Sequence, residues 1–315
     1  MAKTKYKSVW MCNNCGATFP KWEGRCSECG EWNTMVEQRV STSARADRGL
    51  TGTEGARPVA VSDITAGSES RIPMPSRELN RVLGGGLVTG SMVLIGGEPG
   101  IGKSTLVLQN ILAIKSKTVL YVSGEESASQ IKMRADFIGR GSDNVLIVCE
   151  TILERNMRHV EDINPGILII DSIQTIYSEA LESSAGSVSQ VRECAARLLQ
   201  YAKTTSTPVI LIGHITKEGS LAGPKVLEHI VDAVLQFEGD SKYMYRILRA
   251  IKNRFGSTNE LGIYEMCQRG LREVMDPSQV LMTRGDTSLS GVSIGVTLEG
   301  IRPFLIECQA LVSTA

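Results

Sequence analysis

Short apolar runs alternate with segments of helical length along most of the chain. Five such runs lie at residues 91–97, 118–124, 144–150, 166–172 and 207–214. Apolar runs of this length joined by helices are typical of parallel strands with right-handed crossovers. Residues 233–239 and 245–254 are predicted to be two further strands, joined by a turn at Gly239-Asp240. The pattern therefore predicts an α/β domain with a mostly parallel sheet.

Segments of different composition flank this α/β region. Residues 1–38 contain two Cys pairs and all three Trp. Residues 39–60 are rich in Ser, Thr, Gly, Ala and Arg, a composition that buries little apolar surface, so we expect a flexible linker there. The α/β domain is expected over residues 61–276. Residues 290–315 alternate again like strand and turn, and we expect a separate segment over residues 277–315.

Composition and charge narrow the choice of function only slightly. The chain has 315 residues, of which 42% are hydrophobic, and this fits one large domain with a small module. Its 34 Lys and Arg equal its 34 Asp and Glu, so bulk charge argues neither for nor against a nucleic-acid partner. We find no signal peptide and no apolar run long enough to span a membrane, and we expect no membrane partner.

A glycine-rich loop follows the first apolar run. It matches the pattern G-x-x-x-x-G-K-[ST] and consists of Gly97, Glu98, Pro99, Gly100, Ile101, Gly102, Lys103 and Ser104, with Thr105 next. A strand before the loop and a helix after it are the context in which this motif cradles nucleotide phosphates. We expect Lys103 to reach the β- and γ-phosphates of ATP and Ser104 to bind Mg²⁺, with the helix N-terminus adding a favourable dipole. A chance match is the alternative, and the flanking pattern weakens it.

Acidic residues near the ends of two other apolar runs are candidates for the remaining ATPase chemistry. Asp171 follows four apolar residues and is predicted to bind Mg²⁺. Glu125 and Glu126 follow the run at 118–124, at the edge of the sheet where ligands gather, and either is placed to activate water. Two solvated acids at a helix N-terminus explain the pair equally well.

Four cysteines near the N-terminus form two Cys-x₂-Cys pairs, with ten residues between the pairs: Cys12, Cys15, Cys26 and Cys29. This spacing, with a Gly after each pair and no nearby His, predicts a closed structural Zn²⁺ site of four thiolates. Disulfide or redox pairs are the alternatives, and a reducing intracellular location disfavours disulfides. DNA, a partner protein or the ATPase itself are candidate contacts of this module. The other cysteines have apolar neighbours and are predicted to be small core residues: Cys149, Cys194, Cys267 and Cys308.

Several motifs together resemble the bacterial RadA (Sms) family of RecA-like ATPases. They are the cysteine quartet and residues 78–87 (ELNRVLGGGL), 96–105 (GGEPGIGKST), 121–127 (YVSGEES), 168–175 (LIIDSIQT) and 252–256 (KNRFG). The match covers essentially the whole chain. The resemblance implies a RecA-like P-loop ATPase core, preceded by a small four-cysteine zinc module, that acts in recombinational DNA repair.

The resemblance also implies how such a protein works. Members of the family bind single-stranded DNA, assemble into hexameric rings and promote branch migration as helicase-like motors. They carry a C-terminal Lon-protease-like domain without proteolytic function, of which residues 277–315 would be an incomplete start.

Four residue roles follow from the same resemblance. Glu125 is implied to be the catalytic carboxylate, and His214 a sensor of the γ-phosphate. Lys252 and Arg254 match a cation pair that RecA-like ATPases extend over the nucleotide of the adjacent subunit, and their spacing of two puts both side chains on one face of a strand. Pattern alone explains His214 as a satisfied residue at a strand end. It explains the two cations as part of a solvated edge strand protected against aberrant pairing.

Two segments, 178–190 and 216–225, resemble the loops that face the central channel in such rings. The second carries Lys217 and Lys225, which are implied to contact DNA phosphate. Both segments are rich in Gly, Ser and Ala, and this composition equally fits mobile surface loops.

Together with this resemblance, the motifs predict a cytoplasmic ATPase with ATP, Mg²⁺ and Zn²⁺ as cofactors. The resemblance implies that it depends on DNA and acts as a ring on single-stranded and branched DNA. We expect a homo-hexamer, and a recombinase or replication protein is a candidate partner. An ATP-switched assembly protein that does not act on DNA is the alternative. An ATPase serving a Lon-type protease is disfavoured, because no Ser–Lys dyad is visible in the sequence.

Overall fold

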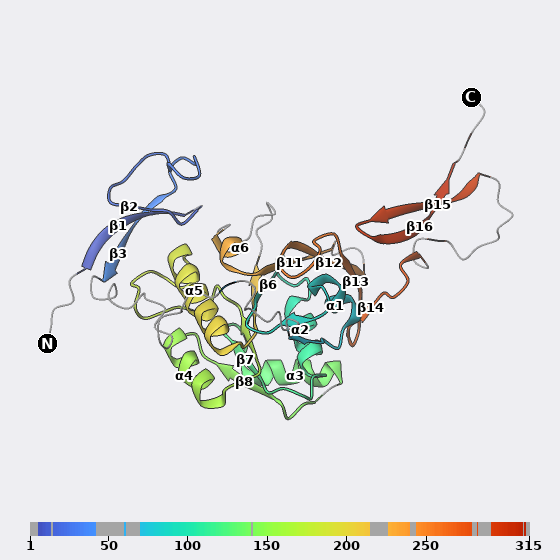
Figure 1. Ribbon diagram of the computed structural model, residues 1–315, viewed down its shortest axis with the longest axis horizontal. Coiled ribbons are helices and arrows are strands. Elements are labelled where there is room, and N and C mark those ends of the chain that lie inside the picture. The colour runs from blue at the N-terminus through green and yellow to red at the C-terminus, as the bar shows by residue number, and fades with distance from the viewer. Residues whose placement is uncertain are drawn as a thin grey trace.

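The computed structural model describes most of the chain, and Figure 1 shows the arrangement of its elements. The described residues are 6–13, 15–41, 60, 70–139, 141–214, 226–239, 244–278, 282, 291–310 and 312. Along the chain, a small N-terminal sheet comes first, a large α/β body second and a β-hairpin last. Among the described residues, no helix is both long enough and apolar enough to cross a membrane.

The N-terminal sheet is antiparallel and carries the cysteine quartet. Its strands are β1 (Tyr6–Cys12), β2 (Thr18–Phe19) and β3 (Met35–Ser41), in the order β2-β1-β3. The pairing of β1 with β3 continues to Ser41, three residues beyond the boundary expected at residue 38. Residues 42–59 of the expected linker lie outside the described residues.

A nine-stranded sheet forms the centre of the α/β body, in the order β14-β13-β12-β11-β6-β10-β9-β7-β8. Its strands are β6 (Met92–Gly97), β7 (Val119–Ser123), β8 (Val145–Cys149), β9 (Ile167–Asp171), β10 (Val209–His214), β11 (Ala233–Glu238), β12 (Tyr245–Asn253), β13 (Leu261–Cys267) and β14 (Gly270–Glu273). The strands from β11 to β8 in this order run parallel, and β12, β13 and β14 are antiparallel. Every residue of β6, β7 and β9 is buried, because helices cover both faces of the sheet. The predicted mostly parallel sheet is confirmed, and β13 and β14 are additional.

The helices divide between the two faces of this sheet. They are α1 (Arg77–Leu83), α2 (Lys103–Ile111), α3 (Ala128–Ile138), α4 (Leu153–Ile163), α5 (Val188–Thr205) and α6 (Val226–Ile230). Helices α1, α2 and α3 contribute to one hydrophobic core, and α4, α5 and α6 to the core on the opposite face. Ser76, Ser127 and Ser187 cap the N-termini of α1, α3 and α5 by accepting backbone N–H groups, and Gly84 and Gly139 end α1 and α3 in the left-handed conformation. A two-stranded ribbon of β4 (Arg71–Ile72) and β5 (Leu87–Val88) precedes and follows α1.

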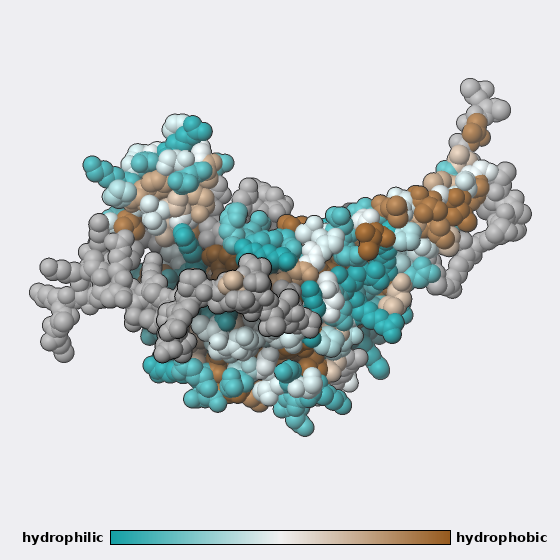
Figure 2. Space-filling view, in the orientation of Figure 1, coloured by the Kyte–Doolittle hydropathy of each residue, from teal (hydrophilic) through white to brown (hydrophobic). Residues whose placement is uncertain are grey.

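The C-terminal hairpin consists of β15 (Val292–Glu299) and β16 (Arg302–Gln309). One face of β15 presents Ile294, Val296 and Leu298, each more than 60% exposed. Figure 2 shows the resulting apolar surface over the hairpin. The strand-and-turn pattern predicted for this part of the chain is confirmed.

Three of the four scattered cysteines correct the prediction that all are core residues. Cys194 on α5 is fully buried as predicted. Cys149 and Cys308 are exposed and Cys267 is half-buried. Cys149 ends the edge strand β8, and Cys308 lies on the two-stranded hairpin, so neither lies in an interior strand. Apolar neighbours in the sequence mark a strand, but they do not tell an interior strand from an edge strand.

Candidate active site and metal centre

The carboxyl ends of neighbouring parallel strands bring most of the predicted ATPase residues together, with the exception of Lys252 and Arg254. Gly97 at the end of β6 pairs with His214 at the end of β10. Asp171 at the end of β9 pairs with Ser123 at the end of β7, and Glu125 follows two residues later. This is the edge at which open parallel sheets bind ligands.

The phosphate loop has backbone conformations and close contacts that require glycine. A Cβ atom on Gly97 would lie 2.6 Å from the carbonyl oxygen of Phe237, so no larger residue fits there. Gly100 and Gly102 have φ angles of 76° and 110°, a region that other residues adopt only with strain. Helix α2 begins directly after the loop at Lys103. The solvent-exposed loop residues are Glu98, Pro99 and Gly100, Ile101 is buried, and Ser104 and Thr105 are half-buried.

Three side chains form one hydrogen-bonded chain across this edge. Lys103 Nζ donates to the carbonyl oxygens of Gly97 and Glu98 at 2.8 and 2.9 Å and lies 3.3 Å from Nδ1 of His214. Nε2 of His214 lies 3.0 Å from Oε1 of Glu125. An ammonium group can only donate, so Nδ1 of His214 is the atom that can accept from Lys103, and Nε2 is the atom that can donate to Glu125.

Glu125 is held ionised by its neighbours. Ser172, which the sequence analysis had not identified, donates its hydroxyl to Oε1 of Glu125 at 2.5 Å. Burial raises the pKa of Glu125. The hydrogen bonds from Ser172 and His214 and the charge of Lys103 lower it by more than burial raises it, so the net pKa lies below the usual value. An ionised carboxylate at this position is suited to orienting or deprotonating water.

Burial acts on Lys103 in the opposite sense. Lys103 is only 4% exposed. Desolvation lowers the pKa of its ammonium group to about 8, although the nearby charges of Asp171 and Glu125 raise it. A cation that loses so much hydration gains when an anionic ligand enters the site.

Asp171 is positioned by a second residue that the sequence analysis had not identified. The hydroxyl group of Tyr121, on the neighbouring strand β7, donates to Oδ2 of Asp171, and both residues are buried. Asp171 and the Ser104 hydroxyl are the oxygen donors that would hold Mg²⁺, and hard oxygen donors beside a phosphate-binding loop fit this ion. When bound, Mg²⁺ neutralises charge on the phosphate oxygens.

The two adjacent glutamates point to different partners. Glu126 accepts a hydrogen bond from the guanidinium group of Arg134 on α3. Its backbone N–H donates to the Ser123 hydroxyl at 3.0 Å. Glu125 therefore is the glutamate that faces Lys103.

The first predicted channel loop is folded around one buried amide. The side-chain nitrogen of Gln190 donates to three carbonyl oxygens between residues 178 and 183, at 3.0–3.1 Å. Gln190 is fully buried, so this loop has a defined conformation. The second predicted channel loop, 216–225 with Lys217 and Lys225, lies outside the described residues.

Lys252 and Arg254 both contact residues 228–232, which run from α6 to the start of β11. Lys252 Nζ donates to the carbonyl oxygens of Glu228 and Val231 at 2.5 and 2.7 Å. Arg254 Nη1 lies 3.2 Å from Oδ1 of Asp232. The two cations therefore lie beside the same short segment.

These two cations lie near the amino ends of the parallel strands, whereas the phosphate loop lies at their carboxyl ends. Asn253 at the end of β12 pairs with Ala233 at the start of β11. Ala233 in turn pairs with Val93, near the start of β6, whereas the phosphate loop follows Gly97 at the end of β6. A strand rises about 3.3 Å per residue, so the length of the sheet separates the cations from the phosphate loop of the same chain.

The cysteine quartet has the geometry of a tetrahedral zinc site. The four sulfur atoms lie within 4.8 Å of one another, with Cys12 and Cys29 3.7 Å apart and Cys15 and Cys26 3.5 Å apart. Zinc–sulfur bonds of about 2.3 Å in a tetrahedron separate the sulfurs by about 3.8 Å, whereas a disulfide bond is about 2.05 Å long. The quartet therefore fits Zn²⁺, and no disulfide joins its members.

Two matching turns present the thiolates. Gly16 N–H donates to the Cys12 carbonyl at 2.8 Å, and Gly30 N–H donates to the Cys26 carbonyl at 2.9 Å. Both glycines have φ near 75°, which is why a glycine follows each pair. The Gly16 carbonyl also accepts a hydrogen bond of 2.9 Å from Arg192 on α5. The zinc module therefore contacts the α/β body at the N-terminal part of α5.

We expect purified protein to contain about one zinc ion per chain, and Cys12→Ser or Cys29→Ser to reduce this to near zero. Three thiolates leave the tetrahedron open, so the ion is lost to a mild chelator. Elemental analysis measures the ratio. Cys308→Ser is the matched control, because Cys308 is exposed and distant in sequence from the quartet, and it should retain the metal. Protein prepared without chelator that contains no zinc would contradict the assignment.

Comparisons with known protein families agree with both sites. A family model described as an AAA domain matches residues 56–220, and one described as a rubredoxin metal binding domain matches residues 10–37. The first implies ATP and Mg²⁺, and the second, with its four close cysteines, implies Zn²⁺. Among solved structures, a KaiC-like protein of Pyrococcus horikoshii is similar with a TM-score of 0.54 and 22% identity, over 65% of this chain and 99% of that one. A RadB recombinase is similar with a TM-score of 0.50 and 22% identity, over 64% and 98%. The predicted RecA-like P-loop fold with a four-cysteine module is confirmed.

Similarity to curated proteins extends along the whole chain. The DNA repair protein RadA of Bacillus subtilis is 49% identical over 99% of this chain and 69% of its own length. The protein of the same name from Pseudomonas aeruginosa is 48% identical, with the same coverage of both chains. The phosphate loop, the carboxyl-edge cluster and the cysteine quartet all lie within these matched lengths. The chain belongs to the family of bacterial DNA repair proteins named RadA.

Proposed function

We propose that this protein is a DNA-dependent ATP hydrolase that binds single-stranded and branched DNA and drives branch migration as a ring oligomer. The observation that supports hydrolysis best is the hydrogen-bonded chain from Lys103 through His214 to Glu125. Asp171 lies at the same edge of the sheet. A phosphate-binding cation, a carboxylate for water and a carboxylate for metal are the groups that phosphoryl transfer to water requires.

Each residue of the chain has a defined task in this proposal. Lys103 binds the β- and γ-phosphates, and Glu125, held by Ser172, orients the attacking water and accepts its proton. His214 contacts both Lys103 and Glu125, so it responds when either one changes partner. His214 is also the last residue of β10, directly before the second channel loop. Loss of the γ-phosphate is thereby communicated toward the DNA-binding loops.

Sequence similarity and geometry support the DNA and ring parts of the proposal in different ways. The relatives with about half of their residues identical are named DNA repair proteins, which supports a role in recombinational repair. Lys252 and Arg254 are too far along the sheet to reach the phosphate loop of their own chain, which supports a site completed by a neighbouring subunit. A hexameric ring and a recombinase or replication protein as partner are part of this proposal.

We also propose the division of the chain into a zinc module that ends with β3 at Ser41, a linker up to residue 60, an ATPase domain (61–276) and the start of a C-terminal domain (277–315). The apolar face of β15 supports the last part. A strand face with several exposed aliphatic side chains is normally covered by further structure.

Single-stranded DNA is expected to raise the ATP turnover of the wild-type protein several-fold. The affinity for DNA should fall steeply with salt, because each phosphate contact releases condensed counterions, with a slope of about −0.7 per contact in a plot of log affinity against log salt. Phosphate release is measured with and without DNA over a salt series. Turnover that depends on protein concentration but not on DNA would favour the ATP-switched assembly protein instead.

A further inference from the structure

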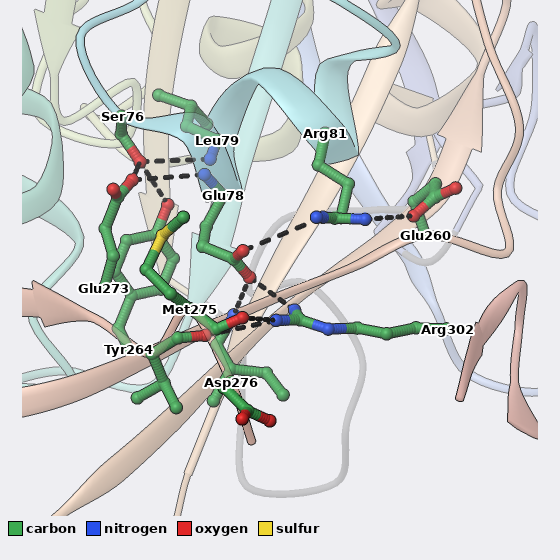
Figure 3. Close-up of polar contacts among 12 residues, drawn as sticks. Ser76, Glu78, Leu79, Arg81, Glu260, Tyr264, Glu273, Met275, Asp276 and Arg302 are labelled. Atoms are coloured by element: carbon green, nitrogen blue, oxygen red, sulfur yellow. Dashed lines mark hydrogen bonds and ion pairs between the residues drawn. The ribbon is translucent and has the colours of Figure 1, made fainter. Parts of the chain in front are cut away.

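A buried ion pair fastens the C-terminal hairpin to the ATPase domain. Arg302 of β16 and Glu78 of α1 are 7% and 1% exposed, and Arg302 Nη1 lies 2.6 Å from Oε2 of Glu78. The second guanidinium nitrogen of Arg302 donates to the carbonyl oxygens of Val274 and Met275 at 3.1 and 3.0 Å. Figure 3 shows Arg302 reaching from the hairpin into this network. Removing one partner of such a pair leaves an uncompensated charge in the interior.

Glu78 depends on Arg302 for its compensation. Oε2 of Glu78 also accepts the backbone N–H of Ile263 at 2.9 Å, while Oε1 has no hydrogen-bond partner. Among the described residues, Arg81 is the other cation that faces Glu78; it is exposed, and its Nε lies 3.7 Å from Oε1 of Glu78. Without Arg302, the Glu78 carboxylate would gain by moving toward water, and α1 would move with it.

The end of α1 holds the backbone that carries Lys252 and Arg254. One helical turn after Glu78, the carbonyl oxygen of Val82 accepts a hydrogen bond of 3.1 Å from the side chain of Asn253. The same Asn253 side chain accepts the backbone N–H of Phe255 at 2.9 Å. The residue after the helix, Gly84, approaches the backbone of residue 256 so closely that a Cβ on Gly84 would lie 3.1 Å from its Cα. A movement of α1 is therefore transmitted to residues 253–256.

We propose that Arg302 is a positioning residue for the Lys252 and Arg254 cations of its own chain. It acts through Glu78 and α1. The inference rests on the proposed function, because it assumes that these cations complete the ATPase site of a neighbouring subunit. The hairpin thereby contributes to hydrolysis at a site that it does not touch.

Mixed oligomers separate the donation of cations from hydrolysis within a chain. Chains with Lys103→Ala do not hydrolyse ATP themselves but still offer Lys252 and Arg254 to a neighbour. Wild-type chains are mixed with an excess of Lys103→Ala chains or of Lys103→Ala/Arg302→Met chains, and turnover per wild-type chain is measured. We expect the added Arg302→Met change to lower this turnover about tenfold or more, since a misplacement of about 1 Å far from the chemistry can cost about 10²-fold.

Two further variants connect this effect to the buried charge. Glu78→Gln combined with Arg302→Met removes both charges and should restore most of the turnover per wild-type chain in the mixed oligomers. Arg249→Met is the matched control, because it breaks the exposed ion pair of 2.8 Å between Arg249 and Glu299 of the same hairpin and should leave donation unchanged. Nucleotide affinity of Arg302→Met chains should equal that of wild type, because their own phosphate loop lies at the carboxyl ends of the parallel strands.

Equal donation by Lys103→Ala and Lys103→Ala/Arg302→Met chains, with equal incorporation of labelled chains into the oligomers, would overturn the inference. If the Arg302→Met chains fail to incorporate, Arg302→Gln replaces them, and full donation by that uncharged variant has the same meaning. Lys103→Ala/Lys252→Ala chains form the separate arm for the proposed function. If these chains also support full turnover at a wild-type neighbour, the proposal that Lys252 and Arg254 act on a neighbouring subunit is wrong, whatever the effect of Arg302.

Discussion

Replacing Lys103 with Ala is expected to lower ATP turnover by about 10³-fold, the upper end of what the loss of one preorganised donor costs an enzyme. Lys103 is buried between the phosphate loop and His214, and no other described lysine contacts this loop. Phosphate release at saturating ATP and DNA measures the effect. Lys132→Ala is the control, because Lys132 is an exposed residue of α3 that pairs with Asp136 and lies outside the site, and it should retain full turnover. Near-normal turnover of Lys103→Ala with its zinc content intact would contradict the P-loop assignment.

The same lysine should make nucleotide binding take up protons. Burial lowers the pKa of Lys103 to about 8, so about half of the chains carry a neutral amine at pH 8. The phosphates of ATP favour the ammonium form and raise this pKa, so binding at pH 8 should take up about half a proton per site, and less at pH 7, where Lys103 is already charged. Binding enthalpies in buffers of different ionisation enthalpy measure the uptake. The Lys103→Ala variant should show none, and wild-type binding without proton exchange at pH 8 would argue against this charge state.

Replacing Lys252 with Ala is expected to lower turnover by about 10³-fold, because cations supplied in trans raise phosphoryl-transfer rates by about 10³–10⁵ in related enzymes. The variant should still bind ATP normally, since its own phosphate loop is unchanged. Mixed with wild type, it should reduce activity more than in proportion to its fraction, because each variant chain disables the site of its neighbour. Arg254→Lys should also lose activity, because a point charge does not replace the planar guanidinium group.

Dilution supplies the control for this interpretation. Wild-type specific activity should fall when the protein is diluted through the range in which it assembles. If activity in the mixing experiment simply follows the wild-type fraction, and turnover does not depend on concentration, the two cations act within their own chain or contact only DNA.

The parallel part of the sheet could be predicted because its strands are buried on both faces and appear as continuous apolar runs. The antiparallel strands β13 and β14 were not identified, because polar residues such as Glu265 and Arg272 interrupt their apolar pattern. Cys149 and Cys308 were wrongly placed in the core, since an edge strand and a hairpin have the same local sequence pattern as an interior strand. Burial of a strand depends on its neighbours in the sheet, and the local sequence of the strand does not reveal those neighbours.

In the candidate site, too, local motifs could be predicted, whereas contacts between distant parts of the chain could not. A contiguous loop such as 97–104 carries its own geometry, and so does a Cys-x₂-Cys turn followed by glycine. The roles of Glu125 and Glu126 looked alike in sequence, because only the fold places Ser172 and His214 beside one and Arg134 beside the other. Tyr121 was missed for the same reason, since a tyrosine within an apolar run is most simply a core residue.

The position of the phosphate loop and the Lys252–Arg254 pair at opposite ends of the parallel strands has a consequence for stoichiometry. If the cations complete a neighbour's site, as proposed, the two chains cannot meet as a two-fold symmetric pair, in which one patch of each chain meets its own copy. The phosphate loop and the cation pair lie at opposite ends of the strands, so such a contact would be head-to-tail. An open array of n chains then contains n−1 complete sites, with an idle phosphate loop at one end and an idle cation pair at the other. Only closure of the array makes every site complete. Activity per chain should therefore rise with the length of the array and reach its maximum in the closed ring, so that turnover itself reports whether the assembly has closed.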